Sequence, residues 1–168
     1  MAETFRGEFY QKVDGKARVS IPASFRRVLE GGDPAQGPNP RVVIVYGGDR
    51  AYVECYTLAE MSRIERRIAR MPMGSTPRRY LERNMITLSQ TVEVDGDGRI
   101  VLSAKAREKM GLATIADKTE AVFAGTLDKF QIWRSDAYEA ELTATFSADI
   151  LADGQDMLSL LPPDDPEA

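Results

Sequence analysis

The strongest constraint on the fold of this chain is an internal repeat. Residues 13–27 (VDGKARVSIPASFRR) and 94–108 (VDGDGRIVLSAKARE) align without a gap at a constant offset of 81 residues. Six of the fifteen aligned pairs are identical: Val13/Val94, Asp14/Asp95, Gly15/Gly96, Arg18/Arg99, Ala23/Ala104 and Arg26/Arg107. A repeat of this kind indicates one small unit that occurs twice. A unit of about 50 residues buries too little surface to be stable alone, so we expect the two copies to pack against each other.

Local signals predict the same series of elements in each copy. A first strand leads to an Asp-Gly pair, at 14–15 or at 95–96, which favours a tight turn because Asp bonds its own backbone and Gly accepts a positive φ. A second strand and a short helix follow. Pro22 suits the first position of the first helix, and Ser103 suits the N-cap of the second. After each helix, two alternating apolar runs separated by a Gly-bearing turn predict a β-hairpin.

The segment between the two copies is predicted to be helical and rich in arginine. Thr57 followed by Glu60 matches a capping box, and Thr76-Pro77 suits the start of a second helix. From Leu58 to Asn84 there are seven Arg and three Glu, a net charge of +4. Two interpretations remain open: a surface that faces phosphates or another subunit, and the solvated side of an amphipathic helix pair.

Charge is distributed unevenly along the chain. Residues 135–168 contain nine Asp or Glu and no Lys or Arg. Residues 1–134 therefore carry all 22 basic residues with the other 17 acidic ones, a net charge of +5 that is compatible with phosphate binding. The expected domain organisation is a first module (8–57), a helical spacer (58–89), a second module (90–134), a C-terminal helix (135–149) and an acidic, flexible tail (150–168).

Composition disfavours an enzyme. The chain has no His, which excludes a Ser-His-Asp triad, a Cys-His pair and an imidazole metal site. The lone Cys55 cannot form an internal disulfide, and no signal peptide or membrane-spanning run is evident, so a reduced cytoplasmic location is expected. Asp95-Gly96-Asp97-Gly98 is not a calcium loop, because Arg99 and Ala106 occupy ligand positions. No catalytic residue, metal, cofactor or small-molecule substrate is predicted.

The repeated motif resembles the DNA-binding module of the SpoVT/AbrB family. The resemblance rests on Val-Asp-Gly-Lys-Ala-Arg-Val-Ser-Ile-Pro-Ala-Ser-Phe-Arg-Arg at 13–27, on its duplication, on Phe5-Arg6-Gly7 and on the arginine-rich spacer. It covers the chain to about Trp133 and extends into the helix after Ser135. The fold that it implies is α+β, with two tandem swapped-hairpin β modules that form a pseudo-symmetric barrel, and with helices between and after them.

The same resemblance implies a function. The chain is expected to be a transcriptional regulator that binds double-stranded DNA sequence-specifically. It would act in the cytoplasm, at the nucleoid, as a ring-shaped homo-oligomer on repeated promoter elements of the division and cell-wall gene cluster. An antitoxin-like protein that uses the module to bind a protein partner is the alternative, which the duplication and the spacer disfavour. A hydrolase with paired carboxylates, Asp95 and Asp97, is the second alternative, and no neighbouring base supports it.

The predicted DNA-binding residues lie in the first copy. Carried over from the family motif, they are Lys12, Lys16, Arg18, Arg26 and Arg27. Asp14, Gly15, Asp95 and Gly96 are assigned to the structural turns, and Arg99 is assigned a structural role as the second-copy counterpart of Arg18. The second copy has Asp97 in place of Lys16, and three acidic groups around one arginine would repel phosphate. Ala17 stands where the family usually has Gly, and it would be strained if that position requires a positive φ.

Overall fold

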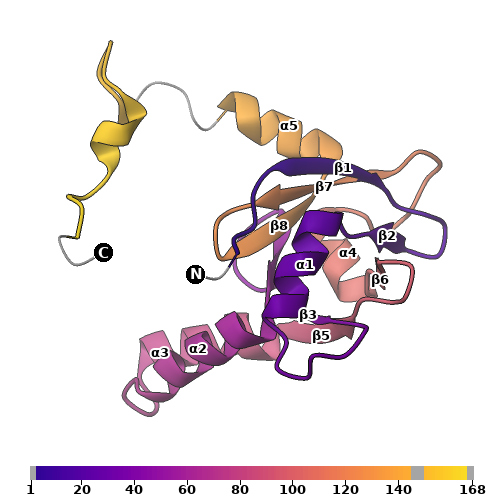
Figure 1. Ribbon diagram of the computed structural model, residues 1–168, viewed down its shortest axis with the longest axis horizontal. Helices are drawn as coiled ribbons and strands as arrows, with labels where there is room; N and C mark the ends of the chain where they lie inside the picture. The colour runs from indigo at the N-terminus through magenta and orange to yellow at the C-terminus, as the bar shows by residue number, and fades with distance from the viewer. Residues whose placement is uncertain (1–2, 145–149, 166–168) are drawn as a thin grey trace.

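A computed structural model of the chain describes residues 3–144 and 150–165 (Figure 1). The two copies and their hairpins contribute β1 (Glu8–Lys12), β2 (Arg18–Ser20), α1 (Ala23–Gly31), β3 (Arg41–Val45), β4 (Tyr52–Tyr56), β5 (Ser89–Glu93), β6 (Arg99–Val101), α4 (Ala104–Met110), β7 (Glu120–Gly125) and β8 (Lys129–Arg134). The segment between the copies forms α2 (Leu58–Ala69), α3 (Thr76–Leu81) and the π-helix η1 (Glu82–Thr87). After the second copy come α5 (Ser135–Ala144) and the 3-10 helix η3 (Met157–Leu160). The expected mixture of helices and mainly antiparallel strands is confirmed.

The main sheet joins strands from both halves of the chain. Its six strands follow the order β1-β7-β8-β4-β3-β5, and every neighbouring pair is antiparallel. The predicted hairpins are confirmed as β3–β4 and β7–β8. The first strand of each copy pairs with the hairpin of the other copy: β1 lies on β7, and β5 lies on β3. Through this reciprocal exchange of strands, each half of the chain covers the apolar surface of the other.

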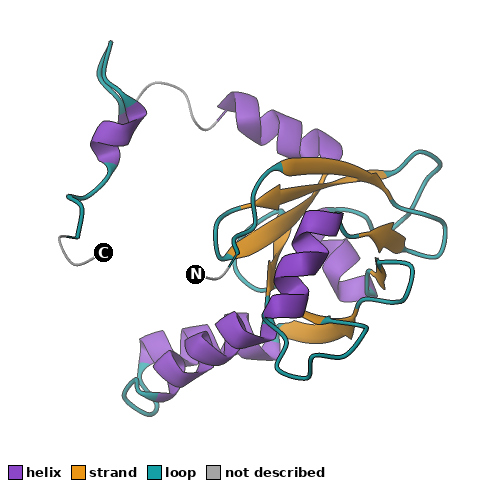
Figure 2. Ribbon diagram, in the orientation of Figure 1, coloured by secondary structure: helices purple, strands orange, loops and turns teal. Residues whose placement is uncertain are grey.

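The expectation of a closed barrel is not met by the described strands. β1 and β5 are the two edges of the six-stranded sheet, and β2 and β6 pair with each other in a separate two-stranded antiparallel ribbon. The reason is that each chain segment changes sheet at its Asp-Gly turn. β1 enters the turn from the main sheet, and β2 leaves it for the ribbon, so the turn does not connect two strands of one hairpin. Figure 2 shows the ribbon at one end of the molecule, beside α1 and α4.

The core lies between the strands and the two short helices. Phe25 and Leu29 of α1 are fully buried, and Ala106 and Met110 of α4 occupy the corresponding place in the second copy. The ring of Phe25 is tilted on Phe130 at 5.0 Å and meets Phe5 edge-on at 5.3 Å. Phe5 is also held by an isolated bridge to Leu127. Residues from both halves therefore fill a single hydrophobic core.

The helix ends follow the predicted signals with one correction. Ser103 caps α4 through its Oγ, which accepts from the backbone N of Ala106 at 3.2 Å. Thr57 caps α2 by accepting from the backbone N of Glu60 at 3.0 Å. Pro22 is the N-cap residue of α1, not its first helical residue, and its φ of −52° and ψ of 140° are those of extended backbone. Proline is tolerated at the N-cap because the backbone N–H there has no helical partner to lose.

The helices between the two copies project from the body. We call the segment Leu58–Thr87, with α2, α3 and η1, the arm; in Figure 1 it extends away from the end that carries β2 and β6. Its root is fixed at the β3–β4 turn, where the side chain of Asn84 accepts from the backbone N of Gly48 at 2.9 Å. Gly47 is required there, because a Cβ would lie 2.7 Å from the backbone carbon of Asn84. The sequence did not predict the π-helix.

The last helix lies on the outside of the sheet. Tyr138 of α5 contacts the ring of Trp133 at 5.9 Å and donates a hydrogen bond to Glu8 of β1. Burial and this carboxylate raise the pKa of Tyr138 to about 12, so it remains a donor. Of the predicted C-terminal helix, residues 145–149 lie outside the described residues, as do residues 166–168 of the predicted acidic tail.

Candidate nucleic-acid interface

The loop between β1 and β2 is organised around the carboxylate of Asp14. Its Oδ1 accepts hydrogen bonds from the backbone N of Lys16 and of Arg18, both at 2.9 Å. Its Oδ2 accepts from Nε of the Arg18 side chain at 2.7 Å. The backbone hydrogen bond from Arg18 is the largest cause that lowers the pKa of Asp14, so the carboxylate is ionised at neutral pH. Asp14 thus fixes both the turn and the direction of Arg18.

Ala17 adopts the left-handed conformation that the family pattern reserves for Gly. Its φ is 62°, and its side chain is buried, with 6% exposed. The backbone O of Ala17 accepts from the backbone N of Leu102 at 2.8 Å, and in the second copy Gly98 O accepts from Ile21 N at 2.9 Å. These matched bonds hold each loop against the other copy. The substitution therefore leaves the loop geometry intact and strains the backbone at that position.

The second loop has the same backbone and a different arrangement of side chains. Asp95 Oδ1 accepts from the backbone N of Asp97 at 2.8 Å and of Arg99 at 3.0 Å. Here the arginine bonds a different carboxylate: Arg99 Nη2 donates to Asp97 Oδ2 at 3.1 Å, while Arg99 Nε lies 3.9 Å from Asp95. Arg99 Nε is buried without a hydrogen-bond partner among the described residues. The two arginines are equivalent in sequence and are held differently.

The two-stranded ribbon places both arginines on one face. Val19 pairs with Ile100, and both are buried with 1% exposed, so the alternate positions point outward. Arg18 pairs with Val101 of β6, and Arg99 pairs with Ser20 of β2. Val101 is an exposed apolar residue, with 56% of its surface accessible. Ser20 and Val101 were missed as surface residues of this face, although alternation along Arg18-Val19-Ser20 could have indicated them.

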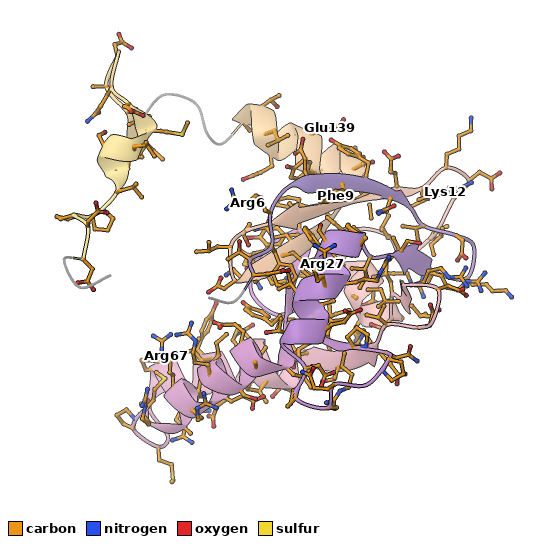
Figure 3. All side chains as sticks on the ribbon, viewed as in Figure 1. Arg6, Phe9, Lys12, Arg27, Arg67 and Glu139 are labelled. Atoms are coloured by element: carbon orange, nitrogen blue, oxygen red, sulfur yellow. The ribbon has the colours of Figure 1, made fainter. Side chains whose placement is uncertain are left out.

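The antiparallel pairing puts one loop at each end of this ribbon face. At the first end, Lys16 is exposed in the same loop as Arg18. Lys12 is exposed at the end of β1, opposite Glu120 of β7, and is labelled in Figure 3. At the other end, Asp97 stands where Lys16 stands in the first copy. The backbones of the two loops are therefore related by an approximate two-fold symmetry, whereas the charges of their side chains are not. Residues 12–18 contain three cations and one acid, whereas residues 93–99 contain one cation and three acids.

Arg26 and Arg27 do not share the surface of the loop. Arg26 Nη1 donates to the backbone O of Ile21 at 2.6 Å, and Arg107 Nε bonds Leu102 O at 3.3 Å in the same way in the second copy. This shared role joins helix to strand and indicates a structural use of the guanidinium of Arg26. Arg27 is exposed on α1, where Figure 3 labels it, and lines a hollow of about 600 Å³ beside the arm.

That hollow was not anticipated from the sequence. It lies between α1 and the start of α2, and its charged lining includes Arg27, Arg63, Arg66, Glu60 and Asp128. Arg63 is already paired with Glu60 at 2.7 Å. Among the described residues no group of His, Cys, Asp or Glu could hold a metal ion. In the same part of the chain, no helix has the length and apolar character needed to cross a membrane.

Comparison with known proteins identifies the family. Residues 85–158 match the model of the MraZ protein family, whose description makes it a candidate antitoxin-like family. A protein named transcriptional regulator MraZ from Cereibacter sphaeroides is 62% identical over 164 residues, which cover 96% of this chain and 97% of that protein. The chain belongs to the MraZ family. A MraZ regulator from Ruegeria pomeroyi is 45% identical over 98% of this chain and 92% of its own.

More distant MraZ proteins align over most of the same length. The regulator of Stenotrophomonas maltophilia is 29% identical over 89% of this chain and 95% of its own length. The similarity therefore extends from the repeat through the arm and the second copy. The MraZ relatives carry the name of transcriptional regulators, and that name describes no catalytic activity.

Proposed function

We propose that this MraZ family member is a sequence-specific DNA-binding transcriptional regulator, and that the loop of residues 12–18 contacts the DNA. The observation that carries the proposal is the different state of the two equivalent arginines. Asp14 holds Arg18 through Nε, and among the described residues neither terminal amino group of that guanidinium has a hydrogen-bond or ion-pair partner. In the second copy, one terminal amino group of Arg99 donates a hydrogen bond to Asp97.

A guanidinium held in this way is suited to DNA. Its two terminal amino groups can donate together to O6 and N7 of a guanine, or clamp one phosphate. Lys16 and Lys12 add point charges for neighbouring phosphates, and Asp14 prevents Arg18 from losing its orientation. The acidic second loop would repel the phosphate backbone of DNA. We therefore assign the second loop to folding and assembly.

The proposal includes the architecture and the assembly. The reciprocal pairing of β1 with β7 and of β5 with β3 supports two intertwined SpoVT/AbrB-like modules, with boundaries near 8–57 and 90–134. One loop supplies few contacts, so its affinity would be weak and dependent on salt. A ring of identical chains would present many such loops, and avidity would follow where repeated promoter elements match their spacing. The division and cell-wall gene cluster is the proposed target, and the cytoplasmic nucleoid the proposed location.

The test is binding of the purified full chain to a promoter fragment with tandem short repeats, measured by fluorescence anisotropy over a salt series. Arg18→Ala is expected to weaken binding by about 1–3 kcal/mol per contact, since it removes a base or phosphate contact. Arg99→Ala is the matched control and should bind nearly as the unsubstituted chain. The loop should persist in Arg18→Ala, because both backbone bonds to Asp14 remain. A folded oligomer without preference for the repeats would overturn the proposal.

An antitoxin-like interaction protein is the second candidate, and the description of the family model favours keeping it. It predicts a stable complex with a second, different protein and no preference for repeated DNA. The same purified chain distinguishes the two functions, since the regulator needs no protein partner to bind the fragment.

A further inference from the structure

The arm carries an open apolar groove. Its floor is formed by Ile64, Ile68 and Met71 from α2 and the turn after it, and by Leu81 and Met85 from α3 and η1; Arg67 completes the lining. We call these six residues the arm groove. Its volume is about 420 Å³, within the range of about 300–1,000 Å³ that is usual for clefts that bind ligands or side chains. No described segment of the chain fills it.

The arm is rich in arginine, and Arg67 is the one arginine among the described residues that lines the arm groove. Arg63 is neutralised by Glu60, and Arg78 is paired with Glu82 at 3.5 Å. The other arginines of the arm have no ion pair or side-chain hydrogen bond among the described residues: Arg66, Arg67, Arg70, Arg79 and Arg83. Figure 3 shows Arg67 on the outer part of the arm. A segment that fits this groove should therefore combine apolar side chains with acidic ones.

The C-terminal end of the same chain has that composition. Met157 and Leu160 lie one turn apart in the 3-10 helix η3, where residues three apart share a face, and Leu158 and Leu161 follow the same spacing. All four side chains are exposed, with between 56% and 72% of their surface accessible. Asp156 caps η3, accepting from the backbone N of Leu158 at 3.1 Å. Residues 150–168 contain no Lys or Arg.

We propose that residues 156–161 of one copy of this chain dock in the arm groove of a second copy, with Met157 and the three leucines on the apolar floor and Asp156 beside Arg67. Charge and apolar surface are complementary, and within one chain both surfaces remain open. An exposed row of four large apolar residues is costly in a monomer and is typical of an interaction surface. The inference rests on the self-association that the proposed function includes, and it names one contact within that assembly.

The test is chemical cross-linking between two single-cysteine variants of the full chain. Leu160→Cys and Arg67→Cys are made in chains with tags of different size, mixed, and treated with a short bismaleimide. Both positions are exposed, so both variants should fold. The natural Cys55 is fully buried, and burial raises the pKa of its thiol, so it should not react. Lys105→Cys, at an exposed position of α4, replaces Arg67→Cys as the matched control.

We expect a mixed cross-linked dimer from Leu160→Cys with Arg67→Cys. No such dimer should form when Lys105→Cys replaces Arg67→Cys, or when Leu161→Asp is added to the tail. A chain with both cysteines that links only within itself would overturn docking between copies. Sedimentation velocity of the untreated protein separates the possible failures. An oligomer without the cross-link overturns the tail contact alone, whereas a monomer without the cross-link overturns the contact and the proposed ring together.

Discussion

Gly98→Ala is expected to destabilise the protein by about 3 kcal/mol, whereas Ala17→Gly, at the equivalent position of the first loop, is expected to change stability by less than about 1 kcal/mol. The two residues share the left-handed conformation, with φ of 77° and 62°. They differ in their surroundings. A Cβ at Gly98 would contact Arg26 Nη1 and lie 2.8 Å from Arg26 Cζ, and Arg26 would have to leave its bond to Ile21 O.

The magnitudes follow from these contacts. In Gly98→Ala, backbone strain in the left-handed conformation lowers the free energy of unfolding by about 1–2 kcal/mol, and loss of the charged hydrogen bond lowers it by about 1.5–3 kcal/mol. The reduced conformational entropy of the unfolded chain raises it by about 0.4–1 kcal/mol. In Ala17→Gly, relief of about 1–2 kcal/mol of strain is offset by a buried methyl worth about 0.8 kcal/mol and by the greater freedom of the unfolded chain.

Urea unfolding measures both changes. Trp133 is the single tryptophan and is buried, with 6% exposed, so its fluorescence reports on unfolding of the sheet. Protomer concentration must be held constant, because the proposed self-association would contribute to the apparent stability. The reasoning is refuted if Gly98→Ala is as stable as the unsubstituted chain, or if Ala17→Gly is destabilised as much as Gly98→Ala.

Two further substitutions test other contacts by the same unfolding assay. Ser103→Ala should lower the free energy of unfolding by about 1 kcal/mol, because it removes the α4 cap, and Ser103→Asp should restore it; an unchanged stability in Ser103→Ala would show that the cap contributes nothing. Asp33 is buried, and hydrogen bonds from the Arg41 side chain hold the pKa of its carboxyl far below the ordinary value of about 3.9. Its stabilising contribution is therefore present above about pH 4 and is lost as the pH falls toward the folded-state pKa. Asp33→Asn should lower stability by about 2 kcal/mol at pH 7 and flatten the decline in acid, and an equally steep decline in the variant would contradict the assignment.

Sequence patterns predicted the elements that local chemistry determines. The turns at Asp14 and Asp95, the Ser103 and Thr57 caps and the two hairpins each depend on neighbours within a few residues. The positive φ expected at Gly15 and Gly96 is wrong, because the left-handed residues of these turns are Ala17 and Gly98. The exchange of β1 and β5 between halves could not be assigned to particular strands, because pairing partners 108–116 residues apart for β1 and β7, and 44–52 residues apart for β3 and β5, depend on the packing of the whole core. The expected closed barrel failed for the same reason, since the ribbon of β2 and β6 follows from contacts across the repeat.

The sequence indicated which residues the candidate loop contains, but not how their side chains are arranged. The position of Lys16, Arg18 and Asp14 in one loop follows from their spacing, and the structure adds that Asp14 bonds Nε of Arg18. The repeat indicated Arg99 as a counterpart, but its bond to Asp97 depends on a side-chain rotamer that no local pattern specifies. Arg26 and Arg27 were grouped with the loop because they match basic positions of the family motif. In the structure Arg26 bonds Ile21 O, and Arg27 lines the hollow beside the arm.

The most direct measurement of DNA binding through the first loop is a pair of charge exchanges, Lys16→Asp and Asp97→Lys, each titrated by anisotropy with the repeat fragment over a salt series. Both residues are exposed, so neither exchange should disturb folding. Lys16→Asp should abolish repeat-specific binding and reduce the salt slope by about 0.9 for each lost phosphate contact. Asp97→Lys should keep binding, because Arg18 and Lys16 are intact. Full binding by Lys16→Asp, or loss of binding confined to Asp97→Lys, would contradict DNA recognition by residues 12–18.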